Sequence, residues 1–194
     1  MTRVIAGAAG GRRLAVPAGR DTRPTSDRAR EGLFGSIVSM VGPLNGKRVL
    51  DLYAGSGAVG LEALSRGADH VLLVEAGRPA VAVIRANIEA IGLPGAVLAA
   101  DKVERVIGGE PDARYDVVFA DPPYAVPGGE IGTLLVNLAG QGWLGPDALV
   151  VVERATRSGQ LNWPAGFRPE RSRRYGEATF WYGLAPEAGA PDDE

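Results

Sequence analysis

Five short runs of apolar residues, from residue 49 onward, constrain the fold of this 194-residue chain more than any other feature. Each run is continuous rather than alternating, which is typical of strands buried on both faces of a parallel sheet. The runs cover residues 49–53, 71–74, 96–99, 117–120 and 149–152. Helical patterns separate them at 58–66, 78–91, 102–107 and 129–140. This alternation predicts an α/β domain, doubly wound around a mostly parallel sheet.

The two ends of the chain add further elements to this sheet. We expect a small N-terminal β-hairpin at 3–16, a helix at 26–39, and strands at 168–174 and 179–184. Thr25, Ser26 or Asp27 can begin the helix, because each offers a side-chain oxygen to free backbone N–H groups. The last strand is predicted to be antiparallel. The fold class is therefore a Rossmann-like α/β sheet with a β-hairpin extension.

The positive charge of the chain is concentrated near its N-terminus. Seven arginines within residues 1–30 are offset by Asp21 and Asp27, giving +5, so the rest of the chain carries −7 of the total of −2. A basic segment suits contact with phosphates, and a solvated basic surface is an equal alternative on charge alone. We expect a basic hairpin and Arg-rich loop at 1–25, the main domain at 26–184, and an acidic, disordered tail at 185–194.

Several classes of protein are excluded by what the chain lacks. It contains no cysteine, which rules out disulfides, cysteinyl metal sites and a cysteine nucleophile. His70 is the single histidine, which argues against a histidine-based zinc site or a catalytic triad. No apolar run approaches the roughly 20 residues that span a bilayer, and the N-terminus lacks the pattern of a signal peptide. We expect a soluble, cytoplasmic monomer that binds no metal.

A glycine-rich segment lies between the first buried strand and the helix that follows it. It contains Gly55-x-Gly57-x-x-Gly60, and Glu75 stands at the end of the next strand. This is also the fingerprint of dinucleotide sites, so an NAD(P)-dependent oxidoreductase is an alternative. Asp51 ends the strand four residues before the first glycine. A carboxylate there is poorly placed beside a pyrophosphate, but it can reach the ammonium group of a methionine moiety.

The most specific stretch is Asp121-Pro122-Pro123-Tyr124, directly after the apolar run 117–120. Two prolines cannot continue a central strand, so we expect a stiff, exposed turn that holds an acid and an aromatic ring together. The exocyclic amine of a nucleic-acid base is a poor nucleophile that needs such a pairing. The Asp121 carboxylate and the Pro122 carbonyl would accept its hydrogen bonds, and Tyr124 would stack on the base.

The Asp-x-x-x-Gly-x-Gly pattern resembles motif I of the class I S-adenosylmethionine-dependent methyltransferases. On that resemblance, the residues around the methionine part of the cofactor are Asp51, Tyr53, Ala54, Gly55, Ser56 and Gly57. Glu75 would bind the ribose hydroxyls, because a carboxylate is a bidentate acceptor, and Asp101 would contact the adenine amino group. Helix capping after a strand is the alternative for Glu75 and Asp101.

The Asp-Pro-Pro-Tyr motif resembles the signature of methyltransferases that act on adenine N6, cytosine N4 or guanine N2. With the segments 22–34 and 60–68, the chain resembles the bacterial small-subunit ribosomal RNA guanine-N2 methyltransferase family (RsmD) from about residue 3 to 183. The resemblance implies formation of N2-methylguanosine at guanine 966 of 16S rRNA in the 30S subunit. Arginines expected to contact the RNA are Arg12, Arg13, Arg23, Arg28 and Arg30.

The sequence differs from the family pattern at two places, and three alternative functions are kept. The hairpin turn holds Ala8-Ala9-Gly10 where the family often places an aromatic and a basic residue, and Gly35 replaces a polar residue. The nearest rival activity is DNA adenine-N6 methylation. An NAD(P)-dependent oxidoreductase and a non-catalytic ribosome-assembly factor are alternatives from other classes. Trp143, Trp163 and Trp181 are predicted to be packing residues.

Overall fold

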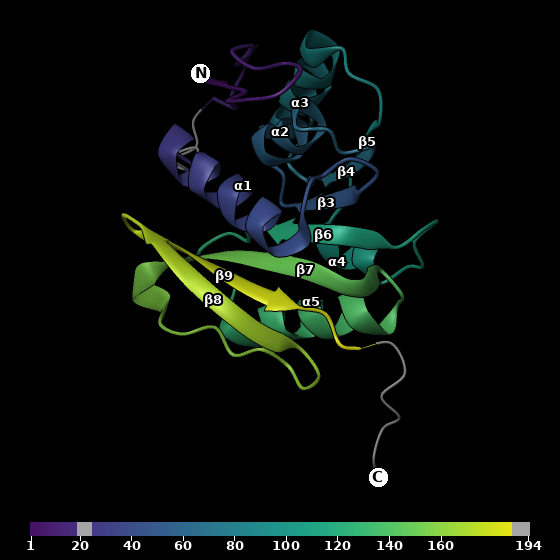
Figure 1. Cartoon of the computed structure of the whole chain (residues 1–194), viewed down its shortest axis with the longest axis vertical. Helices are drawn as coiled ribbons and strands as arrows, with labels where there is room; N and C mark the ends of the chain where they lie inside the picture. Colours follow the sequence, from purple (N-terminus) through teal and green to yellow (C-terminus); the bar gives the residue numbers. More distant parts are fainter. Residues whose placement is uncertain (19–24, 188–194) are drawn as a thin grey trace.

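A computed structural model describes residues 1–18 and 25–187, and the part described contains a seven-stranded sheet in the order β5-β4-β3-β6-β7-β9-β8 (Figure 1). The strands are β3 (Arg48–Leu52), β4 (His70–Val74), β5 (Ala96–Ala99), β6 (Tyr115–Ala120), β7 (Leu144–Ala155), β8 (Arg168–Tyr175) and β9 (Ala178–Leu184). Strands β3 to β7 are parallel, whereas β9 is antiparallel to β7 and β8 is antiparallel to β9. The predicted fold class is confirmed.

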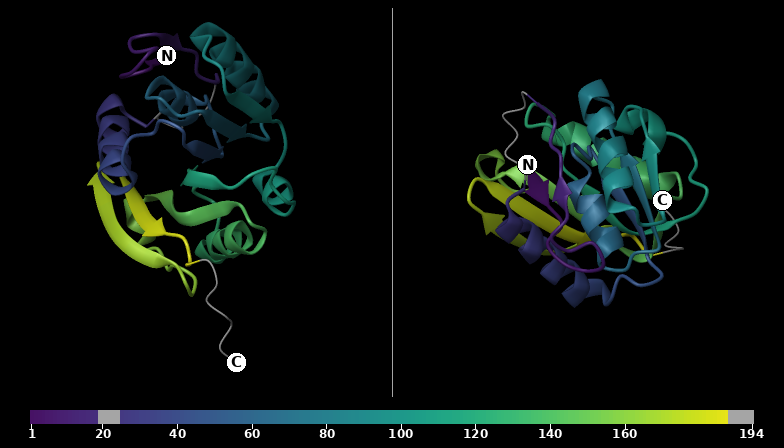
Figure 2. Two further views of the ribbon diagram at one scale, coloured as in Figure 1. Left: turned by 45° about the vertical axis from the view of Figure 1, so that its right-hand side comes forward. Right: turned by 90° about the horizontal axis from the view of Figure 1, so that it is seen from above.

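Helices cover both faces of this sheet (Figure 2). They are α1 (Asp27–Val41), α2 (Ala58–Ser65), α3 (Arg78–Ile91), α4 (Val103–Ile107) and α5 (Gly128–Gly140), with a short 3-10 helix at Thr156–Ser158. Helices α1, α2 and α3 share one hydrophobic cluster with one face, and α4 and α5 share a second cluster with the other. Within the ranges described, no helix is long and apolar enough to cross a membrane.

The start of α1 is set by one of the three candidate capping residues. The Ser26 hydroxyl accepts a hydrogen bond from the backbone N–H of Ala29 at 3.1 Å, which satisfies one of the free donors of the first turn. The helix ends at Gly42, whose φ of 77° lies in the left-handed region. Its buried face is formed by Ala29, Arg30, Leu33, Phe34 and Ile37.

The N-terminal hairpin consists of β1 (Thr2–Arg3) and β2 (Arg13–Leu14), which pair antiparallel. It packs on the end of α2: the Ser65 carbonyl accepts from Ala8 N at 2.8 Å, and the Ser65 hydroxyl accepts from Ala9 N at 2.9 Å. Gly7 makes this approach possible, because a Cβ there would lie 1.8 Å from the Ser65 oxygen and its φ is +84°. The hairpin therefore shares the core of the main domain.

A buried ion cluster completes the attachment of the hairpin. Glu62 of α2 is fully buried, and its two carboxylate oxygens accept from Ile5 N at 2.8 Å and Ala6 N at 3.0 Å. Its charge is balanced by Arg66 Nε at 2.8 Å and by Arg30 Nε at 3.7 Å. One acidic side chain thus joins the hairpin, α1 and α2.

Candidate active site at the carboxyl ends of the strands

Acidic side chains gather at one edge of the sheet, where the parallel strands end. Leu52 of β3 lies opposite Val74 of β4 and Ala120 of β6, and the last residues of β4 and β5 are likewise partners. The acids at or just beyond these strand ends are Asp51, Glu75, Asp101 and Asp121, and Glu153 follows the last residue of β7 that pairs with β6. Four of the five are predicted site residues. Ligands of open α/β sheets bind at this edge, so the geometry marks it as the candidate site.

The glycine-rich loop between β3 and α2 is held in an unusual backbone conformation. Tyr53, Gly55 and Gly57 all have positive φ, at 58°, 61° and 79°. A tyrosine in the left-handed region is strained, and such strain concentrates at functional sites. Gly60 serves packing, because a Cβ there would lie 2.8 Å from the side chain of Leu73. The predicted loop residues, including Ala54 and Ser56, form one tight turn at the site.

Asp51 and Glu75 hold this loop through hydrogen bonds to backbone N–H groups. Glu75 accepts from Gly55 N and from Gly77 N, both at 2.8 Å. Asp51 is 1% exposed and accepts from Gly60 N at 2.9 Å. Burial raises the pKa of Asp51 well above its usual range, and the Gly60 hydrogen bond opposes the shift. These contacts are structural, and cofactor contact by either acid stays a prediction.

On the β5 side, Asp101 and Glu104 flank the loop. Asp101 accepts from Lys102 N at 2.7 Å and pairs with Arg105 at 3.3 Å. The Tyr53 hydroxyl donates to Glu104 at 3.4 Å, and burial, together with Glu104, raises the Tyr53 pKa. Glu104 therefore tethers the strained tyrosine, a role that the sequence pattern did not indicate.

Asn87 of α3 is a second residue that sequence reasoning missed. It is buried, and its amide nitrogen donates to the Ser56 carbonyl at 2.8 Å and to the Ala15 carbonyl at 2.9 Å. Its amide oxygen accepts from Ala15 N at 2.8 Å. Asn87 thus fixes the glycine-rich loop to the segment that follows the hairpin. A polar residue on the apolar face of a predicted helix was the available signal.

The Asp-Pro-Pro-Tyr loop leaves β6 beside the glycine-rich loop. Asp121 N donates to the Leu52 carbonyl at 3.3 Å, and Val126 N closes a turn on the Pro123 carbonyl at 2.9 Å. From β7, Arg154 donates to the Val126 carbonyl at 3.1 Å. Tyr124 is 61% exposed, as the predicted exposed turn requires. Pro122 is buried.

Asp121, directly after β6, and Glu153, within β7 one residue beyond its last pair with β6, form a pair of carboxylates. Burial raises the pKa of Asp121 to about 7, and burial together with Asp121 raises the pKa of Glu153 to about 8. Burial, Glu153 and Asp121 also raise the pKa of Tyr124. Glu153 was not predicted as a site residue, although it directly follows the apolar run 149–152 in the way that the other acids follow theirs.

The predicted RNA-contacting arginines differ in their surroundings. Arg13 and Arg28 are exposed, and Arg12 donates to the Ile91 carbonyl at the end of α3. Arg30 is a correction: it is fully buried, donates to the Arg3 carbonyl, and cannot reach RNA on the surface. Burial lowers the pKa of Arg30, and Glu62 opposes the shift. Arg23 lies outside the described residues.

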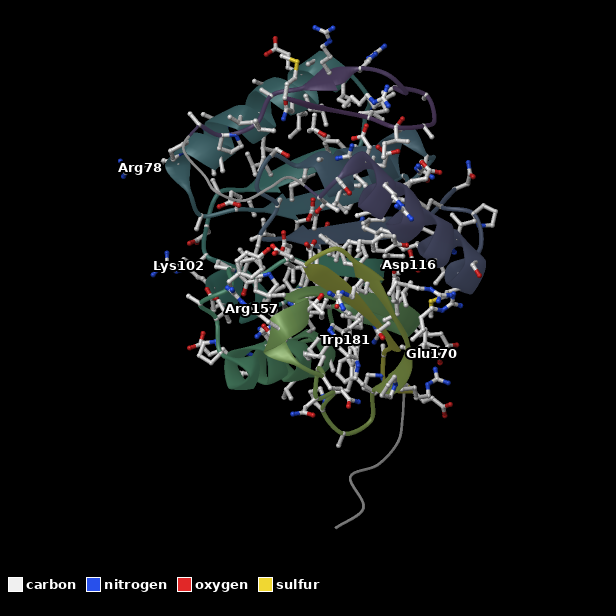
Figure 3. All side chains as sticks on the ribbon, turned by 90° about the vertical axis from the view of Figure 1, so that its left-hand side faces the viewer. Arg78, Lys102, Asp116, Arg157, Glu170 and Trp181 are labelled. Atoms are coloured by element: carbon white, nitrogen blue, oxygen red, sulfur yellow. The ribbon has the colours of Figure 1, made fainter. Side chains whose placement is uncertain are left out.

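Exposed basic side chains also surround the carboxyl-end edge. Figure 3 shows Arg78, Lys102 and Arg157 on one side of the molecule, whereas Asp116, near the start of β6, lies toward the other. The three residues follow β4, β5 and β7, and all are exposed. Counting charge along the N-terminal segment did not reveal this group, because its members come from three separate places: the first residue of α3, the residue before α4, and the 3-10 helix after β7.

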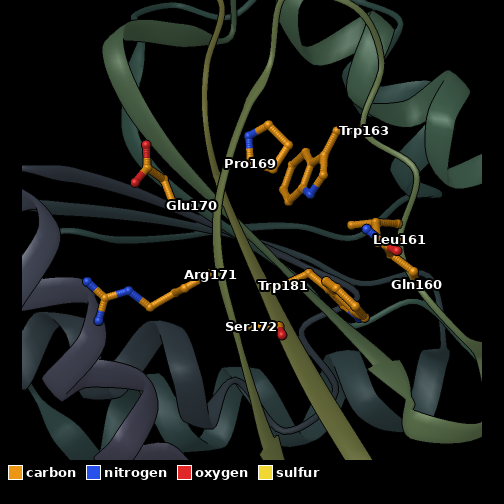
Figure 4. A pocket seen from close by; sticks show the side chains of 8 residues that line it. All are labelled: Gln160, Leu161, Trp163, Pro169, Glu170, Arg171, Ser172 and Trp181. Atoms are coloured by element: carbon orange, nitrogen blue, oxygen red, sulfur yellow. The ribbon is translucent and has the colours of Figure 1, made fainter.

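A shallow hollow lies away from the carboxyl-end site, on strands β8 and β9. Its lining residues are Gln160, Leu161, Trp163, Pro169, Glu170, Arg171, Ser172 and Trp181, none of them a predicted site residue (Figure 4). Trp163 and Trp181 pack against the second hydrophobic cluster, which confirms the packing role expected of them. Figure 4 shows both rings on one side of β8 and Arg171 pointing to the other.

The parallel sheet, the glycine-rich loop and the Asp-Pro-Pro-Tyr loop at neighbouring strand ends together define a class I methyltransferase. A family model described as conserved hypothetical protein 95 matches residues 2–183, and the chain belongs to that family. It is 32% identical over 178 residues to the Escherichia coli protein named ribosomal RNA small subunit methyltransferase D, covering 92% of this chain and 87% of the relative.

Two further comparisons agree with this assignment. The protein named ribosomal RNA small subunit methyltransferase D from Haemophilus influenzae is 32% identical over 154 residues, covering 78% of this chain and 77% of the relative. The solved structure of Escherichia coli yhhF superposes with a TM-score of 0.84 at 30% identity, covering 97% of this chain and 99% of that one. The similarity thus extends through the hairpin, the sheet and the site.

Proposed function

We propose that the protein transfers a methyl group from S-adenosylmethionine to the exocyclic N2 amine of a guanine in 16S rRNA of the small ribosomal subunit. The observation that carries the proposal is the pairing of the half-buried Asp121 with the exposed ring of Tyr124 beside the glycine-rich loop. Family members named small subunit methyltransferases support the choice of RNA. Guanine 966 is the target that the family resemblance implies.

The groups around the glycine-rich loop fit S-adenosylmethionine better than a dinucleotide. Asp51 accepts from Gly60 N at the start of α2, where the pyrophosphate of a dinucleotide would sit, and a carboxylate there would repel it. The ammonium group of S-adenosylmethionine is instead a cationic hydrogen-bond donor, whereas ribose hydroxyls and an adenine amine are donors that both cofactors carry. Each oxygen of a carboxylate has two lone pairs, so Glu75 can accept from hydroxyls as well as from Gly55 and Gly77. Asp101 would face the adenine amine.

The chemical task of the protein is to present the amine in the correct direction. S-adenosylmethionine supplies a methyl group already activated on a sulfonium. The Asp121 carboxylate and the Pro122 carbonyl would accept the two N–H hydrogens, which keeps the lone pair on nitrogen and fixes its direction. Tyr124 would stack on the extracted base. Rate acceleration would come largely from this positioning.

Basic side chains around the same edge would hold the RNA backbone. Arg13, Arg28, Arg78, Lys102 and Arg157 are exposed, so their charges are accessible to phosphates. The target base has to leave its stack to reach Asp121, as single-stranded segments of RNA permit.

One methyl-transfer assay tests donor, substrate and atom together. Unmodified small subunits, naked 16S rRNA and duplex DNA are each incubated with protein and labelled S-adenosylmethionine, and the digested nucleosides are identified by mass spectrometry. N2-methylguanosine from subunits or rRNA is the expected product. N6-methyladenine in DNA would contradict the proposed substrate and target atom. Absence of label in all three would favour the oxidoreductase or the non-catalytic assembly factor.

A further inference from the structure

Glu153 occupies a position that the methyl-transfer chemistry does not yet explain. Strands β6 and β7 are parallel neighbours in which Ala120 lies opposite Val152. Asp121 is the first residue after β6 and Glu153 is the next residue of β7, so the two acids stand side by side at the carboxyl-end edge. On its other side Glu153 lies opposite Phe180 of β9.

The surroundings of Glu153 are costly for a carboxylate. It is 7% exposed, and its Oε2 accepts a hydrogen bond from the Thr25 hydroxyl at 3.3 Å, which is long and comes from an uncharged donor. Its acidic neighbour Asp121 adds repulsion rather than compensation. Within residues 1–18 and 25–187 no lysine or arginine is paired with Glu153, and burying a carboxylate without a cation destabilises a fold, so a group kept in this position is a candidate for ligand binding.

The Watson–Crick edge of guanine carries hydrogen-bond donors that would match the oxygens of Asp121 and Glu153. It presents N1–H directly beside the N2 amino group, whereas adenine presents an unprotonated N1 beside its amino group. When both groups are ionised, two neighbouring carboxylates match two neighbouring donors, and they would repel the N1 lone pair of adenine. Burial and Asp121 raise the pKa of Glu153 to about 8, so the two bases are compared above that pH. Given the proposed function, on which this inference rests, Asp121 faces the N2 amine. The N1–H group of the guanine then lies beside the adjacent acid, Glu153.

We propose that Glu153 determines the choice of base by accepting a hydrogen bond from N1–H of the target guanine. Sites that hydrogen-bond a substrate discriminate strongly against an analogue that lacks the donor, because the buried acceptor is left unpaired. Glu153 is therefore a specificity residue that touches the base, while Asp121 holds the reacting amine.

The test uses a base that keeps the reacting amine and lacks N1–H. Small subunits are assembled on ligated 16S rRNA carrying either guanine or 2-aminopurine at the nucleotide that the wild-type protein methylates. kcat/KM is measured for both substrates with wild type, Glu153→Gln and Thr25→Val. The ratio of the two values within one preparation does not depend on the folded fraction, so partial misfolding of a variant does not affect it.

We expect wild type to favour guanine by about 100-fold or more. Glu153→Gln should narrow that ratio by at least about tenfold, because its amide can donate to the N1 lone pair of 2-aminopurine. Thr25→Val removes the hydroxyl contact but keeps the carboxylate, so it should preserve the ratio. An unchanged ratio in Glu153→Gln, or an equal loss in Thr25→Val, would overturn the assignment. If wild type makes no N2-methylguanosine, the proposed function itself fails, which is a separate result.

Discussion

At the scale of single residues, the acids of the site differ in what their oxygens already bind. Asp51 and Glu75 accept from backbone N–H groups of the glycine-rich loop and its surroundings, so they shape the loop. Asp121 and Glu153 stand together at the next two strand ends. A substitution in the first pair should therefore disturb cofactor binding and local structure, and one in the second pair should disturb catalysis and base selection.

Replacing Asp121 by alanine should remove methyl transfer while cofactor binding survives. The loss removes an acceptor for the amine hydrogens, and we expect the rate to fall by about 10²- to 10⁴-fold. Single-turnover methyl transfer and calorimetric titration with S-adenosylmethionine measure the two properties separately. Glu75→Ala is the matched comparison and should weaken cofactor binding first. A rate within a few-fold of wild type in Asp121→Ala would refute the assigned role.

The raised pKa of Asp121 predicts a pH dependence of the rate. Burial raises this pKa to about 7, and the charged form is the one that accepts the amine hydrogens. The rate should therefore rise as pH increases through 7, and fall by close to tenfold per unit well below it. Single-turnover rates between pH 5.5 and 8.5 test this. Asp121→Asn should be slower and should lose the part of this limb that Asp121 contributes, leaving the titration of Glu153 at a lower pH because the repulsion from Asp121 is removed. A flat wild-type profile would contradict the prediction.

The positions of acids relative to apolar runs predicted site residues well, whereas charge alone did not. Acids following apolar runs located Glu75, Asp101 and Asp121, and Asp51 was located by its spacing from the glycine motif. The same rule applied to the run 149–152 would have found Glu153. Arg30 was assigned from charge alone. Its spacing from Leu33, Phe34 and Ile37 is helical, which places it on the buried face that the structure shows.

At the scale of elements, the predicted boundaries agree best with the observed ones where one apolar run forms a whole strand. The predicted 96–99 matches β5, and the predicted helix 78–91 matches α3. Strand β7 is longer than the predicted 149–152, because the segment containing Pro146 and Asp147 interrupts its apolar pattern. The docking of the hairpin on α2 could not be predicted, since it depends on backbone N–H groups that meet Glu62 and Ser65 only in three dimensions.

The buried ion cluster of Glu62, Arg66 and Arg30 under the hairpin should contribute strongly to the stability of the protein. Glu62→Ala removes one of the two carboxylates paired with the buried Arg30, leaving Asp27 at 3.4 Å, and it removes the acceptor for Ile5 and Ala6. We expect the free energy of unfolding to fall by about 3–5 kcal/mol, measured by urea denaturation. Glu31→Ala is the matched control, because Glu31 pairs with Arg66 at the surface and should cost below about 1 kcal/mol. Equal effects of the two substitutions would disprove the assignment.

At the scale of the whole molecule, the fold class was predictable because strand and helix patterns alternate over more than 100 residues. The distribution of charge was predictable only in part. The N-terminal excess was visible in the sequence, whereas the exposed group of Arg78, Lys102 and Arg157 comes from segments after three different strands, which the parallel sheet brings to one edge.

This distribution predicts where RNA affinity resides. Arg157→Ala should weaken binding of 16S rRNA and lower the slope of log affinity against log salt by about one, because one phosphate contact is lost. Arg114→Ala is the control, since Arg114 is exposed just before β6, at the opposite edge of the sheet. Filter binding at several salt concentrations measures both. Similar slopes for the two variants would exclude the carboxyl-end edge as the RNA surface.

The contact between Thr25 and Glu153 joins positions 128 residues apart in the chain. During synthesis, the N-terminal hairpin emerges well before α2 and α3 can receive it, and β7 emerges later still. The catalytic edge therefore cannot assemble progressively behind the ribosome. The edge is complete only after β7 has been made, so a chain interrupted before β7 would contain the glycine-rich loop without Glu153.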